Sequence, residues 1–279
     1  MNFWTKRSTK LAYELGYLDR LLEIYPIKSN PRRLMPQHLW NNIKKAYNEK
    51  NSKELIRLLN KGVKSYKMKF PVECYYTSSL RNETRWIDLN PKTVKKLSKL
   101  VLDQDIDVIF DKCTAPKKVS RQAGPMFDNW FQTKFRNDRE IKILGTNDNE
   151  RKKNAKKYIN YNSNKGLDVF ININEIYILG EAKFITDSGG TQTNQFKSAL
   201  NIINTFDRND NVIPIAIIDG HCWRKSEDFF YKAILNSEQN QIIISALLLE
   251  DFFNKVKEID TAGQKIKNSE IINYLNSQD

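Results

Sequence analysis

The order of hydrophobic patterns after residue 124 is the feature that most restricts the fold of this chain. Aromatic side chains recur at helical spacing directly after Gly124, which predicts an amphipathic helix. Strand-like segments follow at 167–173, 176–183, 212–218 and 242–248, and a helical segment follows each of the last three. Continuous apolar runs are typical of strands that are buried on both faces. The sequence therefore predicts an α/β layered domain.

The first hundred residues are expected to be mainly helical. Asn51 and Glu54 have the spacing of a helix capping box, and Gly62 is expected to end the helix that they begin. Asn90 and Pro91 are expected to begin another helix, because proline is favoured at the first helical position. A charged, linker-like stretch at 112–122 separates this part from the α/β pattern.

Positive charge is concentrated in the N-terminal part of the chain. The net charge is +13, and residues 1–112 contain 23 lysines and arginines against 12 acidic residues. Residues 113–279 contain 23 against 21. A basic surface attracts polyanions by releasing their counterions, so nucleic acid is the expected partner. A lysine-rich but merely solvated surface is the alternative.

Cysteine and histidine usage argues against several classes of site. The three cysteines are widely separated and there are only two histidines, so we expect neither a disulfide framework nor a structural zinc site. The longest apolar run is too short to span a bilayer, and the N-terminus lacks the apolar stretch of a secretory signal. We therefore expect a soluble, intracellular protein.

Three charged residues are expected to meet on the hairpin formed by the first two strands. Glu181 and Lys183 are two residues apart on one strand, so their side chains project from the same face. Asp168 begins the other strand, and tight pairing would bring it to the same end. An ordinary ion pair of Lys183 with either carboxylate is the alternative to a functional site.

Two carboxylates at close range repel each other, and a hard divalent cation relieves that repulsion. Mg²⁺ takes oxygen ligands and typically uses only one or two protein carboxylates. A bound metal ion lowers the pKa of water and stabilises charge that develops on a phosphate. A neighbouring lysine can orient or deprotonate the attacking water. The cluster of Asp168, Glu181 and Lys183 therefore favours metal-dependent phosphoryl chemistry over a structural ion pair.

The residues around this cluster resemble a known nuclease motif. Residues 166–168 (Gly-Leu-Asp) and 180–183 (Gly-Glu-Ala-Lys) resemble the PD-(D/E)xK motif as type II restriction endonucleases carry it, with Leu167 in the place of proline. Segments 121–130 and 186–192 also resemble restriction enzymes of this kind. The resemblance covers about residues 115–250 in element order.

The resemblance implies a restriction-endonuclease-like core, in which helices flank a central mixed β-sheet. It implies that Asp168 and Glu181 bind Mg²⁺ and that Lys183 positions or activates the water. The implied reaction is sequence-specific hydrolysis of double-stranded DNA that leaves 5′-phosphates. It further implies a prokaryotic, cytoplasmic enzyme with a cognate DNA methyltransferase. Because palindromic cleavage needs two active sites, we expect a homodimer.

Together these observations predict a type II restriction endonuclease in two parts. Residues 1–112 would be a basic, mainly helical DNA-recognition region, and residues 113–279 would be the PD-(D/E)xK catalytic core. The alternatives are a nuclease of DNA repair or recombination with the same core, and a non-catalytic DNA-binding protein.

Five other residues are weaker candidates for the site. Gln192 and Gln195 could face it from the following helix, Asp187 could add a metal ligand, and Asp128 could approach from the aromatic helix. His221 stands beside Cys222, but one histidine and one cysteine do not make a metal site without further ligands. Turn formation, solvation or packing is the expected role of each.

Overall fold

A five-stranded mixed sheet forms the centre of the computed structural model, which describes residues 1–116, 122–163, 165–204, 210–261, 263 and 265–277. The strands, in their order across the sheet, are β1 (Lys142–Ile143), β2 (Val169–Ile173), β3 (Ile176–Ile185), β4 (Val212–Gly220) and β5 (Ile242–Ile244). The first three strands are antiparallel, whereas β3, β4 and β5 run parallel.

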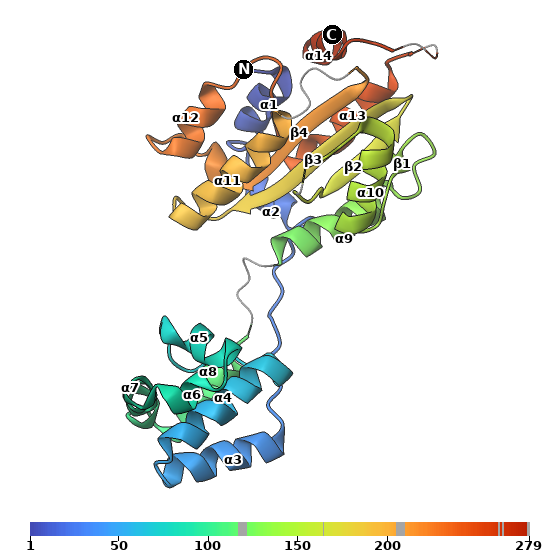
Figure 1. Ribbon diagram of the computed structural model, residues 1–279. Coiled ribbons are helices and arrows are strands. Elements are labelled where there is room, and N and C mark those ends of the chain that lie inside the picture. The colour runs from blue at the N-terminus through green and yellow to red at the C-terminus, as the bar shows by residue number, and fades with distance from the viewer. Residues whose placement is uncertain (117–121, 164, 205–209, 262, 264, 278–279) are drawn as a thin grey trace. The chain divides into compact units, whose positions relative to one another are not determined.

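Helices pack along this sheet (Figure 1). They are α1 (Phe3–Leu11), α2 (Tyr17–Leu21), α9 (Ala123–Phe135), α10 (Asp148–Ile159), α11 (Gly190–Ile203), α12 (Phe229–Leu235), α13 (Leu249–Lys257) and α14 (Asn268–Asn276), with short 3-10 turns η2 (His221–Trp223) and η3 (Ala246–Leu248). Helix α11 contacts β3 and β4, and α10 and α13 contact β2. The expected α/β fold, with helices flanking a mixed sheet, is confirmed.

The chain divides into two compact units, and their boundaries differ from the expected 1–112 and 113–279. Residues Met1–Ile27 belong with Ser120–Asp279 in an α/β unit, while Lys28–Val119 form a helical unit. The physical reason is the aromatic side chain of Trp4, which is 2% exposed and packs edge-to-face on Phe252. Its indole N–H donates to the carbonyl of Leu275, so α1 is part of the α/β core.

Helix α1 also covers the edge of the sheet at β5. The Thr5 hydroxyl accepts from the Ile243 N–H at 3.2 Å, and the Ser8 hydroxyl accepts from the Ser245 N–H at 2.9 Å. The edge of a sheet otherwise presents unpaired backbone groups that can pair with another chain. Side chains of α1 satisfy two of these groups here.

Strand β5 is shorter than the expected 242–248 because Ser245 redirects the backbone. The Ser245 hydroxyl accepts from the Leu247 N–H and donates to Asp219, and the η3 turn begins there. The lysine-rich segment 147–165 contains α10, which the sequence analysis did not predict. Asn147 caps that helix by accepting from the Glu150 N–H.

The helical unit consists of α3 (Gln37–Asn48), α4 (Ser52–Tyr66), α5 (Tyr76–Asn82), α6 (Trp86–Leu89), α7 (Pro91–Leu102) and α8 (Ile106–Thr114). The cap at Asn51 and the start at Pro91 are confirmed. The expected end at Gly62 is wrong, because α4 continues to Tyr66. A β-carbon on Gly62 would lie 2.6 Å from the Met68 sulfur, so glycine provides room for packing rather than a helix end.

The expected linker at 112–122 starts later than predicted. Helix α8 extends to Thr114, and residues 117–121 of the expected linker lie outside the described residues. Residue 164, shortly before the motif that begins at Gly166, also lies outside them. Within the described part of the chain, no helix is long and apolar enough to cross a bilayer.

Candidate active site

The β2–β3 hairpin brings the three predicted site residues together. Asn174 and Glu175 both have positive φ, 46° and 64°, which is the geometry of a tight two-residue hairpin turn. The turn sets a register that pairs Val169 with Gly180, and the N–H of Asp168 donates to the Gly180 carbonyl at 2.9 Å. Asp168 therefore lies opposite Glu181, as the sequence analysis expected.

Lys183 lies between the two carboxylates. Its ammonium nitrogen is 2.8 Å from Oε1 of Glu181 and 3.6 Å from Oδ2 of Asp168. Asp168 Oδ2 also accepts from the Ala182 N–H at 2.8 Å. The side chains of Glu181, Lys183 and Asp168 are 13%, 24% and 30% exposed, so the cluster is partly buried but reachable from solvent. One ammonium does not neutralise two carboxylates.

Burial makes this excess of negative charge costly. It raises the pKa of the Asp168 carboxyl, and the nearby charge of Glu181 adds to the rise. The Lys183 ammonium and the Ala182 N–H act in the opposite direction without cancelling it. A cation placed beside Asp168 would favour the ionised carboxylate, so the electrostatics of the site suit a bound cation.

The oxygen donors suit Mg²⁺. Asp168 and Glu181 provide hard carboxylate oxygens, and Asp168 Oδ1 takes no part in the contacts with Lys183 and Ala182. Among the described residues, no group of three or more His, Cys, Asp or Glu side chains is placed to hold a metal ion by itself. Mg²⁺ is commonly held by one or two carboxylates, with water and substrate phosphate as its other ligands. Asp168 and Glu181 therefore match that pattern.

Ser198 on α11 is a site residue that the sequence analysis missed. Its hydroxyl lies 3.1 Å from both carboxylate oxygens of Glu181 and can donate to either. Ser198 lies one helical turn beyond Gln195, which was considered for the site but for which solvation was the expected role. No local sequence pattern singles out Ser198. Gln192 is instead buried, and its Oε1 has no hydrogen-bond partner among the described residues.

The backbone before Asp168 is fixed by residues from α9 and α10. Arg151 is 3% exposed, forms an ion pair with Asp128, and donates to the carbonyl of Leu167 at 3.3 Å. Asp148 Oδ1 accepts from the Leu167 N–H at 2.9 Å. Asp128 therefore lies outside the cluster and supports it through Arg151.

Glycine is favoured at Gly166 and at Gly180 of the motif for two different structural reasons. A β-carbon on Gly166 would lie 2.7 Å from Asp148 Oδ1, and one on Gly180 would lie 3.0 Å from a side-chain carbon of Ile215. The first allows the Asp148 side chain to approach the chain before Asp168. The second allows β3 to pack against β4 beside the cluster.

Two more of the weaker candidates, Asp187 and His221, have local partners. The Asp187 carboxylate accepts from the Gly189 N–H at 3.1 Å, which is turn chemistry. His221 Nε2 lies 3.1 Å from Asp228 Oδ2 and is not part of the cluster. Neither residue contributes to the arrangement of Asp168, Glu181 and Lys183.

A second buried carboxyl, Asp219, lies at the end of β4. It is fully buried, and it accepts hydrogen bonds from the hydroxyls of Tyr17, Tyr25 and Ser245 and from the Ala246 N–H. Burial raises its pKa from 3.8 to about 6, and the hydrogen bonds oppose that rise. This network ties the N-terminal segment to the sheet.

The raised pKa of Asp219 predicts a pH-dependent stability. Its folded-state pKa is above that of the unfolded chain, so the folded protein binds this proton more tightly. The contribution of Asp219 to the free energy of unfolding should decrease by about 3 kcal/mol as the pH rises from about 4 to about 6, and stay constant above. Urea unfolding in EDTA measures the free energy of unfolding of wild type and of Asp219→Asn. The difference between the two free energies should change with pH over this range. A difference that is the same at every pH would contradict it.

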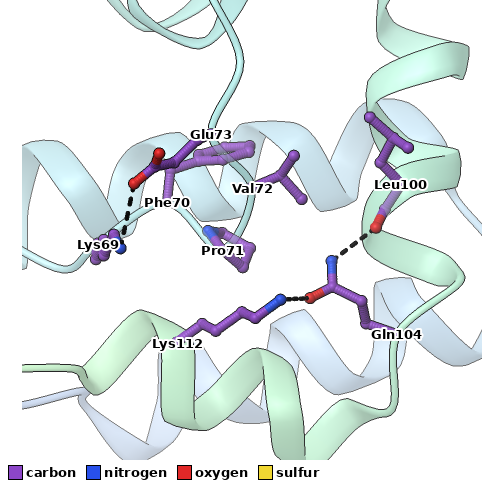
Figure 2. Close-up of a pocket in the computed structure, with 8 residues that line it drawn as sticks. All are labelled: Lys69, Phe70, Pro71, Val72, Glu73, Leu100, Gln104 and Lys112. Carbon is purple, nitrogen blue, oxygen red and sulfur yellow. Dashed lines mark hydrogen bonds and ion pairs between the residues drawn. The ribbon is translucent and has the colours of Figure 1, made fainter.

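A pocket in the helical unit is lined by none of the candidate site residues Asp168, Glu181 and Lys183. It has a volume of about 440 Å³ and is bordered by residues 69–73 and by side chains of α7 and α8. Figure 2 shows Lys112 reaching Gln104, and Gln104 reaching the carbonyl of Leu100. Lys69 is paired with Glu73. Since these polar groups bind one another, we assign no ligand to the pocket.

Comparison with known proteins gives one match. The model of the family described as Tsp45I type II restriction enzyme matches residues 2–256, which is most of the chain. The search of curated proteins and the search of solved structures each found no match.

Proposed function

Because this chain belongs to the Tsp45I type II restriction enzyme family, and is therefore a site-specific deoxyribonuclease, we propose that it cuts double-stranded DNA in a Mg²⁺-dependent reaction. The proposed active site is formed by Asp168, Glu181 and Lys183. The observation that carries the assignment of the site is the position of the Lys183 ammonium between two partly buried carboxylates. A structural ion pair would not need the second carboxylate.

Each of the three residues has a proposed role. Asp168 and Glu181 hold Mg²⁺, which when bound supplies charge stabilisation for the phosphate and a more acidic water. Lys183 orients the attacking water and offsets negative charge on the phosphate. The Ser198 hydroxyl, which reaches both oxygens of Glu181, fixes the orientation of that carboxylate.

The proposed reaction is hydrolysis of the phosphodiester bond. The water oxygen attacks phosphorus, the bond from phosphorus to the 3′ oxygen breaks, and the proton released from water balances the one taken up by the leaving oxygen. The products are a 5′-phosphate and a 3′-hydroxyl. Lys183 lies close to both carboxylates and can donate hydrogen bonds to water or phosphate.

We propose further that the α/β unit performs catalysis while the helical unit, which is most of the expected 1–112 region, binds and recognises DNA. Cleavage of both strands at a two-fold symmetric sequence calls for two sites related by a two-fold axis, so the proposed assembly is a homodimer. A cognate methyltransferase would protect the DNA of a prokaryotic host, in whose cytoplasm the enzyme would act.

The test of this function is a cleavage assay on a large, unmethylated phage DNA. Incubation with Mg²⁺ is expected to give discrete bands, and EDTA is expected to abolish them. Sequencing and end-labelling of the products should reveal one recognition sequence and 5′-phosphates. Intact DNA under both conditions would instead support a non-catalytic DNA-binding protein. A Mg²⁺-dependent smear would support a nuclease of repair or recombination.

A further inference from the structure

Helix α7 carries four lysines on one exposed face, which we call the α7 lysine stripe (Lys92, Lys95, Lys96 and Lys99). Their spacing of three and four residues places them on the same side of the helix, while Val94, Leu97 and Val101 are buried on the other. At 1.5 Å per residue the stripe is about 10 Å long.

No described carboxylate forms an ion pair with this stripe. In the described part of the chain, the ion pairs of the helical unit include none of these four lysines, although Lys53 and Arg57 on the neighbouring α4 both pair with Asp88. Like charges at these spacings oppose helix formation, and a lysine in the first turn also opposes the helix dipole. No acidic residue stands in the first turn of α7 to offset it.

The surrounding unit holds almost all of the net charge. Residues 28–119 contain 21 lysines and arginines against nine acidic residues, whereas the rest of the chain contains 25 against 24. The α/β unit, which holds the proposed catalytic residues, therefore has little net charge with which to attract DNA. The helical unit therefore provides most of the electrostatic attraction for a polyanion.

We propose that the α7 lysine stripe binds consecutive phosphates of one strand of double-stranded DNA. This inference rests on the proposed function, because it names the surface that holds the substrate. The stripe is about 10 Å long, and its flexible lysine side chains extend its reach, so it can contact several neighbouring phosphates of one strand. Contacts to phosphate fix affinity and register but do not read the sequence.

The experiment measures binding without cleavage. A fluorescent 30-base-pair duplex of mixed sequence is titrated in EDTA with wild type, a stripe variant and a matched control over 50–200 mM NaCl. The stripe variant replaces Lys92, Lys95, Lys96 and Lys99 with glutamine. The control makes the same replacement at four exposed lysines, which are Lys45 on α3, Lys50 between α3 and α4, and Lys61 and Lys64 on α4. Both variants lose the same charge from the same unit.

Each phosphate contact contributes about 0.9 to the slope of log K against log salt concentration. We expect the stripe variant to lose about 3 to 4 from this slope and the control to lose less than about 1. Equal losses in the two variants would overturn the proposal, because they would show a general charge effect. An unchanged slope in the stripe variant would also overturn it.

Two further measurements keep the result interpretable. Removing like charges from α7 should leave the urea midpoint of the stripe variant unchanged or higher, so a loss of binding is not a loss of folding. The nuclease proposal is tested separately, by Mg²⁺-dependent cleavage with an intact stripe. A wild type that binds through the stripe but does not cut would contradict the nuclease assignment alone. A wild type that cuts, with equal slope losses in both variants, would contradict the stripe alone.

Discussion

Replacing Asp168 with asparagine is expected to reduce Mg²⁺-dependent DNA cleavage by about 100- to 1,000-fold, the range seen when one preorganised stabilising group is removed from an active site. Asparagine keeps an oxygen that can accept from the Ala182 N–H, but it lacks the charge to hold the cation and is a poorer ligand. Since burial raises the pKa of Asp168, the neutral side chain should not weaken the fold.

The measurement compares initial cleavage rates with the urea unfolding midpoint of the same variant. Asp187→Asn is the matched control, because this exposed aspartate accepts only a turn hydrogen bond that asparagine can also accept. Lys183→Ala should also lose cleavage while leaving duplex binding in EDTA intact. If Asp168→Asn cut DNA at a rate close to that of wild type, Asp168 would not be a metal ligand.

The second large effect is on stability, at Gly220. This glycine is the last residue of β4, with φ 91° and ψ −137°, and a β-carbon there would lie 2.3 Å from the Ile185 carbonyl oxygen. Both the backbone conformation and the backbone contact oppose any side chain. Gly220→Ala is therefore expected to lower the free energy of unfolding by about 3 to 5 kcal/mol.

Urea unfolding measures the effect, and Gly124→Ala is the control. Gly124 lies in the first turn of α9, and apart from its chain neighbours no described atom lies within 4 Å of an added β-carbon, so alanine there should change stability by less than about 1 kcal/mol. A Gly220→Ala protein with the stability of wild type would show that the β3 and β4 ends can separate without cost.

The parts of the site that the sequence predicted depend on local rules. The alternation of side chains along a strand placed Glu181 beside Lys183, and a two-residue turn at Asn174 and Glu175 set the register that brought Asp168 to them. These relations need no knowledge of distant contacts. The order of β2, β3, α11, β4, α12, β5 and α13 was predictable for the same reason, whereas β1, α10 and α14 were not predicted.

The parts that the sequence did not predict depend on contacts between distant segments. Ser198 reaches Glu181 because of how α11 packs on β3, which no local pattern specifies. The end of β5 follows from the bond between Ser245 and Asp219. The failure at Gly62 has the same origin, because the space that this glycine provides is filled by Met68.

The hydrogen bonds of α1 to β5 have a consequence for the order in which the protein folds. Thr5 and Ser8 meet partners that are 238 and 237 residues away along the chain. During synthesis, the helical unit is a continuous segment that can fold as soon as it emerges from the ribosome, because domains generally fold as units. The α/β unit must wait with its first helix unpartnered until β5 is made, and contacts of such long range are slow to form. We therefore expect the helical unit to be folded on the ribosome before the α/β unit is complete.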